Sequence, residues 1–161
     1  MNAATARALS LAVVVLIWTA ISHFAKLPLQ LWPVIVGLAC FVAAGGGLSG
    51  AQKSIAGMVT GVIWALLAYS ISKALGRSEL VDAIVTGAAV FGIVMQARVP
   101  LLSSTASALV GMGVGMGARV ITMEGGLRIA IALVIGAGLG YAAEWGLAMV
   151  QSRRSSGRST A

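Results

Sequence analysis

The stretch SIAGMVTGVIWALLAYSIS, residues 54–72, runs from Lys53 to Lys73 without an intervening charged residue. A transmembrane helix needs about 20 consecutive apolar residues, because the hydrocarbon core of a bilayer is roughly 30 Å thick. Residues 54–75 are therefore predicted to form a membrane-spanning helix. Gly57 and Gly61 are four residues apart within it, a spacing that lets helix backbones approach closely in lipid.

Other apolar stretches of similar length fill the rest of the chain, separated by short basic or glycine-rich segments. They predict helices over 8–24, 31–47, 80–97, 101–118 and 128–150. Residues are 59% hydrophobic and only 9% charged, whereas a typical soluble domain has about 25% charged residues. The predicted fold class is an all-α integral membrane protein, a bundle of six transmembrane helices over residues 1–150, with a short basic disordered tail over 151–161.

The basic residues predict an orientation in the membrane. Six spans place both termini on one side, and that side collects Arg7, Lys53, Arg98 and the basic tail. Cytoplasmic loops are enriched in Lys and Arg, so both termini are expected in the cytoplasm. The net charge of +7 is then explained by loop charges that set topology. The basic residues do not form a stripe interleaved with aromatic residues, so nucleic acid is not expected as a partner.

The chain also contains hints of an internal repeat. Alignment of Pro33 with Pro100, and of Lys53 with Arg128, superposes three pairs of glycines: Gly46 with Gly113, Gly50 with Gly117, and Gly61 with Gly136. Two halves of three helices each would be inverted relative to one another. Many transporters are built in this way, with their site at the repeat interface. Chance matching in a glycine- and alanine-rich sequence is the alternative.

The segment Gly45-Gly46-Gly47-Leu48-Ser49-Gly50 has the G-x-G-x-x-G spacing of a dinucleotide-binding turn. That fold also needs an acidic residue about 20 positions further on, and residues 63–72 contain none, so we reject it. Two interpretations remain. The segment is either a flexible helix end where backbones come close, or a broken helix whose freed backbone groups line a cavity.

Glu144 is the one acidic residue well inside a predicted span. A carboxylate within the membrane is costly, which makes Glu144 a candidate functional residue. It would be a gating, coupling or cation-attracting group. The alternatives are an interfacial residue, since the neighbouring Trp145 suits an aromatic belt, or a structural ion pair with Lys53 or Arg98.

Candidate pore or substrate-binding residues lie near the glycine-rich segment, along the predicted helix over 54–75, in the hydroxyl-rich helix over 101–118, and at the acidic position of the last helix. They are Glu144, Gly46, Gly47, Ser49, Lys53, Thr60, Trp64, Ser104 and Ser107. No catalytic constellation is indicated, since the chain has one histidine, one cysteine and four acidic residues. No metal-ligand spacing is present, and neither an enzyme nor a cofactor is expected.

The run Gly45–Gly50, followed by Lys53-Ser54 and Gly61-Val62-Ile63-Trp64-Ala65, resembles a family of small bacterial inner-membrane proteins. This is the YcdZ-like family, domain of unknown function 1097. The later Gly138-x-Gly140-Tyr141-Ala142 fits the same pattern. The resemblance implies a location in the bacterial inner membrane and a six-helix unit. It implies no catalytic residues.

The function expected from these features is a membrane channel or transporter. Because charge within the spans is scarce, its substrate should be a small neutral or weakly charged solute. The helix over 101–118 and the broken end of the second helix would line the path. The alternative is a non-transporting scaffold or accessory subunit, which would have a dry, tightly packed core. Glycine-rich helices leave few bulky side chains to fill a monomer, so a homo-oligomer in the lipid bilayer is also expected.

Overall fold

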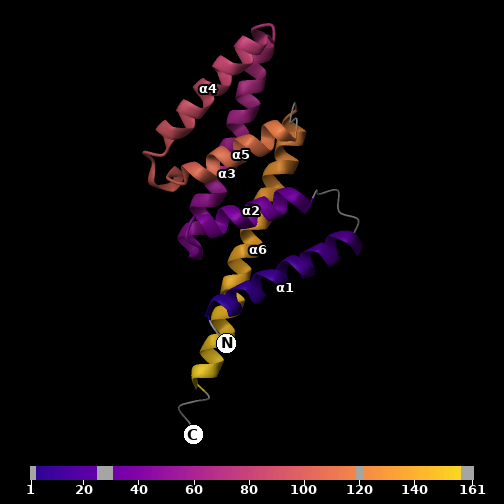
Figure 1. Ribbon diagram of the computed structural model, residues 1–161, viewed down its shortest axis with the longest axis vertical. Coiled ribbons are helices and arrows are strands. Elements are labelled where there is room, and N and C mark those ends of the chain that lie inside the picture. Colours follow the sequence, from indigo (N-terminus) through magenta and orange to yellow (C-terminus); the bar gives the residue numbers. More distant parts are fainter. Residues whose placement is uncertain (1–2, 25–30, 119–121, 157–161) are drawn as a thin grey trace.

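The computed structural model describes residues 3–24, 31–118 and 122–156, and these residues form helices and short connections without a strand. The elements are α1 (Ala3–Phe24), α2 (Leu31–Ala43), α3 (Gly47–Ala74), α4 (Glu79–Gln96), the 3-10 turn η1 (Pro100–Leu102), α5 (Thr105–Gly117) and α6 (Met123–Ser156). In Figure 1, α3 and α6 are the long central helices, α2 and α5 cross them, and α1 and α4 lie outside. The predicted all-helical fold is confirmed.

Three helices are long and apolar enough to cross a membrane, namely α3, α4 and the Met123–Met149 part of α6. The apolar part of α1 and the whole of α2 and α5 are shorter. A 13-residue helix such as α2 is about 20 Å long, which is less than the roughly 30 Å hydrocarbon core. Of the six predicted spans, length and composition therefore support a full membrane crossing for only these three helices.

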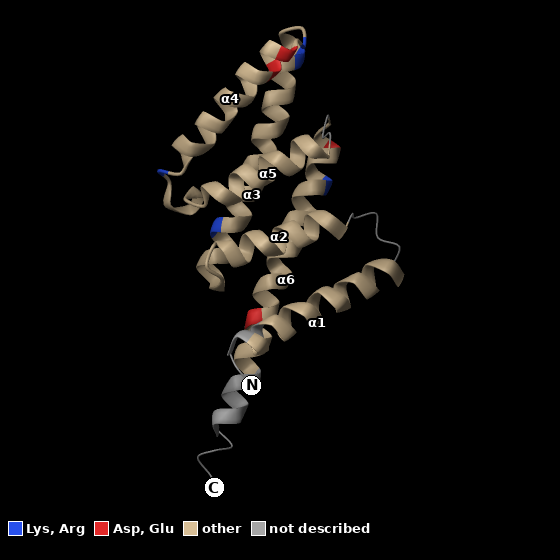
Figure 2. Cartoon of the chain, in the orientation of Figure 1, with Lys and Arg blue, Asp and Glu red and all other residues tan. Residues whose placement is uncertain are grey.

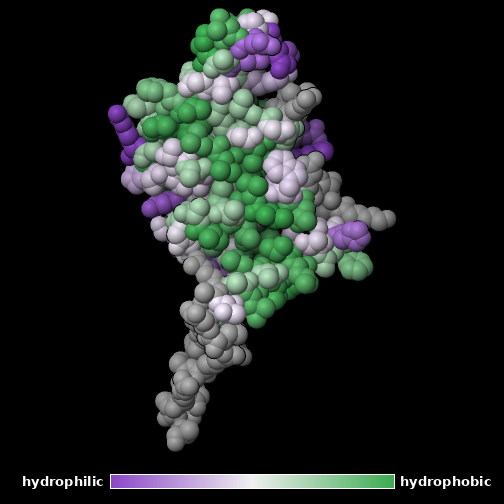
Figure 3. All heavy atoms as spheres, viewed as in Figure 1, coloured by the Kyte–Doolittle hydropathy of each residue, from purple (hydrophilic) through white to green (hydrophobic). Residues whose placement is uncertain are grey.

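The surface agrees with burial in lipid. In Figure 2 the positions of Lys, Arg, Asp and Glu lie mostly towards the ends of the helices, with long uncharged stretches between them. Figure 3 shows hydrophobic atoms over the middle of this face and hydrophilic atoms at its margins. Exposed large apolar side chains include Leu16, Leu80 and Phe91. A contiguous apolar surface of this kind is rare in soluble monomers and suits contact with lipid.

Several predicted boundaries are wrong. The second helix ends at Ala43 rather than 47, because Gly45 and Gly46 have φ values of 94° and 71°, outside the right-handed helical region. The third helix begins at Gly47 rather than 54. The predicted helix over 101–118 is divided into η1 and α5.

The last helix is longer than the sequence predicts. It starts at Met123 and continues through Ser156, into the segment expected as a tail from residue 151. The remainder of that tail, residues 157–161, lies outside the described residues. The early start at Met123 follows a local cap on the first turn, described below.

Two helix pairs form the centre of the fold, and both pack through glycines. In the pair α2–α6, a Cβ added to the glycine would collide with the partner: Gly37 with Leu133, Gly136 with Val34, and Gly140 with Phe41. In the pair α3–α5 the corresponding collisions are Gly111 with Met58, Gly61 with Ala108, and Gly115 with Ala65. Most of these contacts are with the partner's backbone, so the helices approach as closely as helices can.

The centre of the fold is apolar and closed. A cluster of buried side chains from α2, α3, α5 and α6 includes Phe41, Met58 and Leu133, which have no exposed surface. Among the described residues the buried polar side chains are Ser54, Ser72 and Ser107, and the buried polar side-chain atoms found there all have hydrogen-bond partners. The four central helices thus share an apolar core.

Candidate functional site

The structure brings Glu144 to the glycine-rich segment, 97 residues away in the chain. The backbone N–H of Gly47 donates a hydrogen bond to Oε2 of Glu144 at 2.7 Å. Gly46 has no side chain between them, and a Cβ there would collide with both carboxylate oxygens. Its φ of 71° is in the left-handed region that glycine adopts without cost. Three of the predicted site residues, Gly46, Gly47 and Glu144, therefore form one contact.

This contact caps the start of α3. The first N–H groups of a helix have no intrahelical acceptor, and the helix dipole places partial positive charge at the same end. The Glu144 carboxylate from α6 supplies both an acceptor and a compensating negative charge. This explains why α3 can begin at Gly47, ahead of the predicted position. Ser49 is exposed in the first turn of α3 and Lys53 is half-buried in the second.

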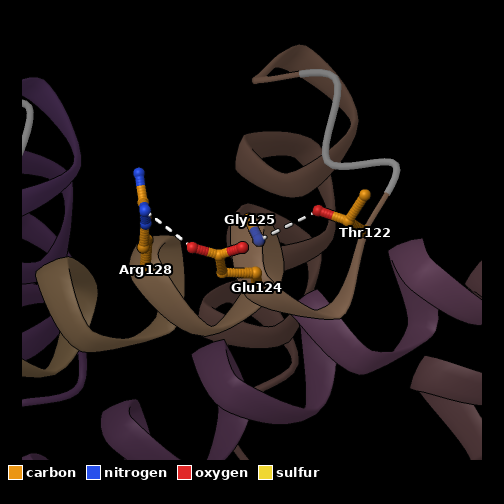
Figure 4. Close-up of polar contacts among 4 residues, drawn as sticks. All are labelled: Thr122, Glu124, Gly125 and Arg128. Carbon is orange, nitrogen blue, oxygen red and sulfur yellow. Dashed lines mark hydrogen bonds and ion pairs between the residues drawn. The ribbon is translucent and has the colours of Figure 1, made fainter.

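The equivalent end of α6 is capped in a different way. Figure 4 shows that Thr122 accepts the N–H of Gly125 through Oγ1, at 3.2 Å, and that Arg128 donates to Oε1 of Glu124 at 2.7 Å. All four residues are local to the first turns of α6. The start of α6 is therefore stabilised by its own sequence, whereas the start of α3 depends on a side chain from another helix.

Thr60 and Trp64 belong to a second polar group, between α3 and α4. The indole N–H of Trp64 donates to Oε1 of Gln96 at 3.0 Å, and Nε2 of Gln96 donates to Oγ1 of Thr60 at 3.2 Å. The Thr60 hydroxyl in turn donates to backbone carbonyls one turn earlier in α3. The end of α4 is thus fastened to the middle of α3 by a chain of hydrogen bonds.

Gly92 makes this arrangement possible. A Cβ at Gly92 would collide with the six-membered ring of Trp64, so the indole can approach α4 this closely only because this position is glycine. The sequence does not single out Gly92, because no other glycine lies four residues from it. The sequence signal that could have indicated Gly92 is its place on the same face of the predicted helix as Gln96, which follows it by four positions.

Ser104 and Ser107 form a third group at the start of α5. Their hydroxyl oxygens are 2.7 Å apart, and Ser107 is 1% exposed. A Cβ added to Gly57 of α3 would lie 3.0 Å from both the Ser104 carbonyl oxygen and the Ser107 Cβ. The two hydroxyls satisfy each other in a tight helix contact. The candidates therefore form three separate groups along α3 and not one site.

These features define an all-helical protein whose longest helices are suited to cross a membrane. Within the described segments, no three side chains of His, Cys, Asp or Glu gather into a possible metal site. The chain belongs to the family described as Protein of unknown function (DUF1097), whose sequence pattern matches residues 8–148. This match covers α2 to α5 completely and most of α1 and α6. No curated protein and no solved structure shows significant similarity to the chain.

Proposed function

We propose that the protein is a membrane transporter for a small neutral or weakly charged solute, built from two inverted repeats, α1–α3 and α4–α6. The observation that supports this proposal is the recurrence of the central helix contacts. Each residue of α2 corresponds to the residue of α5 that lies 74 positions later, as Gly37 does to Gly111. Each residue of α3 corresponds to the residue of α6 that lies 75 positions later, as Met58 does to Leu133.

All three pairs of glycine contacts obey these two offsets. The contact Gly37–Leu133 corresponds to Gly111–Met58, Gly136–Val34 to Gly61–Ala108, and Gly140–Phe41 to Ala65–Gly115. Chance matching of glycines in the sequence would not place their contact partners at the same offsets. The alignment on prolines is wrong, because Pro33 is the third residue of α2 whereas Pro100 opens the separate turn η1.

The paths of the helices support inversion of the halves. In Figure 1, α2 runs from right to left and α5 from left to right, while α3 rises and α6 descends. A two-fold rotation about the viewing direction of Figure 1 brings α1–α3 close to the path of α4–α6. Inverted repeats of this kind are characteristic of secondary transporters, where the two halves alternate between equivalent conformations.

The packed core favours a carrier over an open channel. Met58 and Leu133, which correspond between the repeats, both have no exposed surface. A pore along the interface between the repeats would have to pass these side chains, so transport requires rearrangement. A packed apolar core is also what a non-transporting scaffold or accessory subunit would have, and this remains the second candidate function.

Location and assembly are part of the proposal. Both termini would lie in the cytoplasm, with the protein in the bacterial inner membrane. A homo-oligomer would cover Gly113 and Gly117, whose α-carbons face open space on α5. Small residues four apart on an exposed helix face favour close packing with a neighbouring helix in lipid.

Purified protein in liposomes tests the transport function. Uptake of a panel of small sugars, polyols, amides, amino acids and monocarboxylates would be compared with uptake by empty liposomes. We expect saturable uptake of at least one of these classes. Absence of uptake for the whole panel, by protein that circular dichroism shows to be helical after reconstitution, would exclude this function and favour the scaffold.

A further inference from the structure

The two outer helices, α1 and α4, present corresponding faces to the bundle, but these faces are buried to different extents. On α4, Val85, Ala89 and Ile93 are 9%, 4% and 0% exposed and pack on α3 and α5. The residues of α1 that lie 74 positions earlier are Leu11, Val15 and Thr19. Leu11 and Val15 are only half-buried, and Thr19 is exposed.

The two helices are attached to the bundle at different points along their lengths. The end of α4 is held on α3 by Trp64 and Gln96. The side-chain hydrogen bond that joins α1 to α6 lies near the start of α1, where the Ser10 hydroxyl donates to the Ala143 carbonyl oxygen at 2.7 Å. Towards the other end of α1, Leu16 and Phe24 are 68% and 86% exposed, and Figure 1 shows α1 diverging from α2.

We propose that α1 and α4 are equivalent gates of the transporter, and that this structure has the α4 gate closed and the α1 gate open. In the alternate state α1 closes on α6 and α2 as α4 now closes on α3 and α5, while α4 swings outward. The inference rests on the proposed transport function. It names the moving elements and the contacts that they exchange.

The repeat offsets specify the closed contact of α1. Gln96 corresponds to Ser22 and Trp64 to Leu139, so Ser22 should meet Leu139 when α1 closes. Small residues of α6, Gly140 and Ala143, correspond to Ala65 and Ala68 of α3, which form the surface on which α4 packs. The surface that α1 needs is therefore present within the same chain.

The chemistry of the two gates also explains which one is closed. The α4 gate has an amide, an indole and a hydroxyl that bond one another, Gln96, Trp64 and Thr60. The corresponding residues for α1 are Ser22, Leu139 and Ile135, which cannot make that chain of hydrogen bonds. The α4 gate is the more strongly held, so a closed α4 and an open α1 is the expected resting state.

Cross-linking tests the closure of α1. In a Cys40→Ala background, the pair Ser22→Cys and Leu139→Cys would be treated in proteoliposomes with a short bifunctional methanethiosulfonate. We expect an intrachain cross-link, identified by mass spectrometry. The matched control, Ile21→Cys with Leu139→Cys, places its first cysteine on the outward face of α1, where Ile21 is 50% exposed, and should give at least tenfold less product.

Equal yields from the two pairs, or no cross-link from either, would overturn the closure. A cross-linked dimer in place of the intrachain product would show that a second copy of the chain covers α1, which also overturns it. The gating role is tested by uptake. Cross-linking the Ser22 and Leu139 pair, or the pair Thr60→Cys and Gln96→Cys, should reduce uptake at least tenfold.

The gate and the transport function can fail separately. If the unmodified protein takes up solute and neither cross-link slows it, the gates are wrong and transport stands. If the unmodified protein takes up nothing, the transport function fails and with it the gating role, whatever the cross-linking pattern of Ser22 and Leu139 shows about movement of α1.

Discussion

A hydrogen bond to the start of α3 helps to place Glu144 in an otherwise apolar stretch of α6. The carboxylate accepts the N–H of Gly47, a group that α3 itself cannot satisfy. An acidic side chain is costly within a membrane unless it finds a partner, and a helix start is costly unless it finds an acceptor. Because Gly46 has no side chain, one contact answers both requirements and ties α6 to α3.

Replacement of Glu144 should therefore destabilise the protein. Loss of a capping side chain costs about 1 kcal/mol, and loss of a negative charge near a helix N-terminus costs about 0.3–1 kcal/mol more. We expect Glu144→Ala to lower the unfolding free energy by roughly 1–2 kcal/mol, measured by denaturant titration in detergent. Glu144→Gln keeps an oxygen acceptor and should lose about half as much.

The control for this experiment is Gly146→Ala, two residues along α6, where a Cβ would meet nothing within 4 Å. It should leave the unfolding free energy unchanged or slightly raised. If Glu144→Ala and Glu144→Gln both match the unmodified protein, Glu144 does not stabilise the start of α3.

The sequence indicated Glu144, Gly46 and Gly47 as candidates, but it could not indicate that they touch. Nothing local in Gly47-Leu48-Ser49-Gly50 predicts a helix start, because the acceptor for the Gly47 N–H lies on α6. The same limit applies to Trp64. Its position in mid-helix is evident from the sequence, whereas the bond to Gln96 depends on how α4 folds back on α3.

At the scale of the helices, glycines spaced four residues apart fall into two groups. Gly61, Gly111 and Gly136 are in backbone contact with a partner helix, whereas Gly113 and Gly117 face open space. The close approach predicted at Gly61 is confirmed. The spacing of four residues is the same in both groups, so spacing alone cannot separate a contact within the chain from an outward face.

Two substitutions on α6 should separate these groups. Gly136→Ala would drive a Cβ into the backbone of Val34, whereas at Gly138 a Cβ meets nothing within 4 Å. We expect Gly136→Ala to cost about 1–3 kcal/mol, as overpacking of a close contact does. Gly138→Ala should be neutral or stabilise by up to about 1 kcal/mol, since alanine favours helix more than glycine does.

Unfolding in a mixed-micelle denaturant series, followed by circular dichroism, would measure both variants. Gly61→Ala belongs with Gly136→Ala, because Gly61 makes the corresponding contact with Ala108 in α5. Similar stability of the Gly136→Ala and Gly138→Ala proteins would contradict the close approach of α2 and α6.

At the scale of the whole molecule, inverted halves require that corresponding loops face opposite sides of the membrane. With Cys40 replaced by Ala, Ser49→Cys at the start of α3 and the corresponding Glu124→Cys at the start of α6 would be labelled with a membrane-impermeant maleimide. Both positions are exposed. We expect one to react from outside intact cells and the other only after permeabilisation, with a C-terminal tag on the same side as Ser49. Labelling of both cysteines from one side would contradict the arrangement.

The fold class follows from composition, since a chain with 9% charged residues cannot cover a soluble domain. The correspondence of the halves did not follow from the most conspicuous landmarks. Pro33 and Pro100 lie at different places relative to their helices, because proline is tolerated both in the first turn of a helix and in a turn before it. The offsets that support the proposed repeat emerge only once it is known which glycine meets which backbone.

The pairing of α2 with α6 and of α3 with α5 has a consequence for how the protein is made. The closest contacts of the first half are all with the second half, so α2 has no close partner until the last helix has left the ribosome. Folding of domains during synthesis generally proceeds from the N-terminus, but here the first three helices must wait in the bilayer with their glycine surfaces uncovered. We expect native packing to form late, as α5 reaches α3 and α6 then reaches α2.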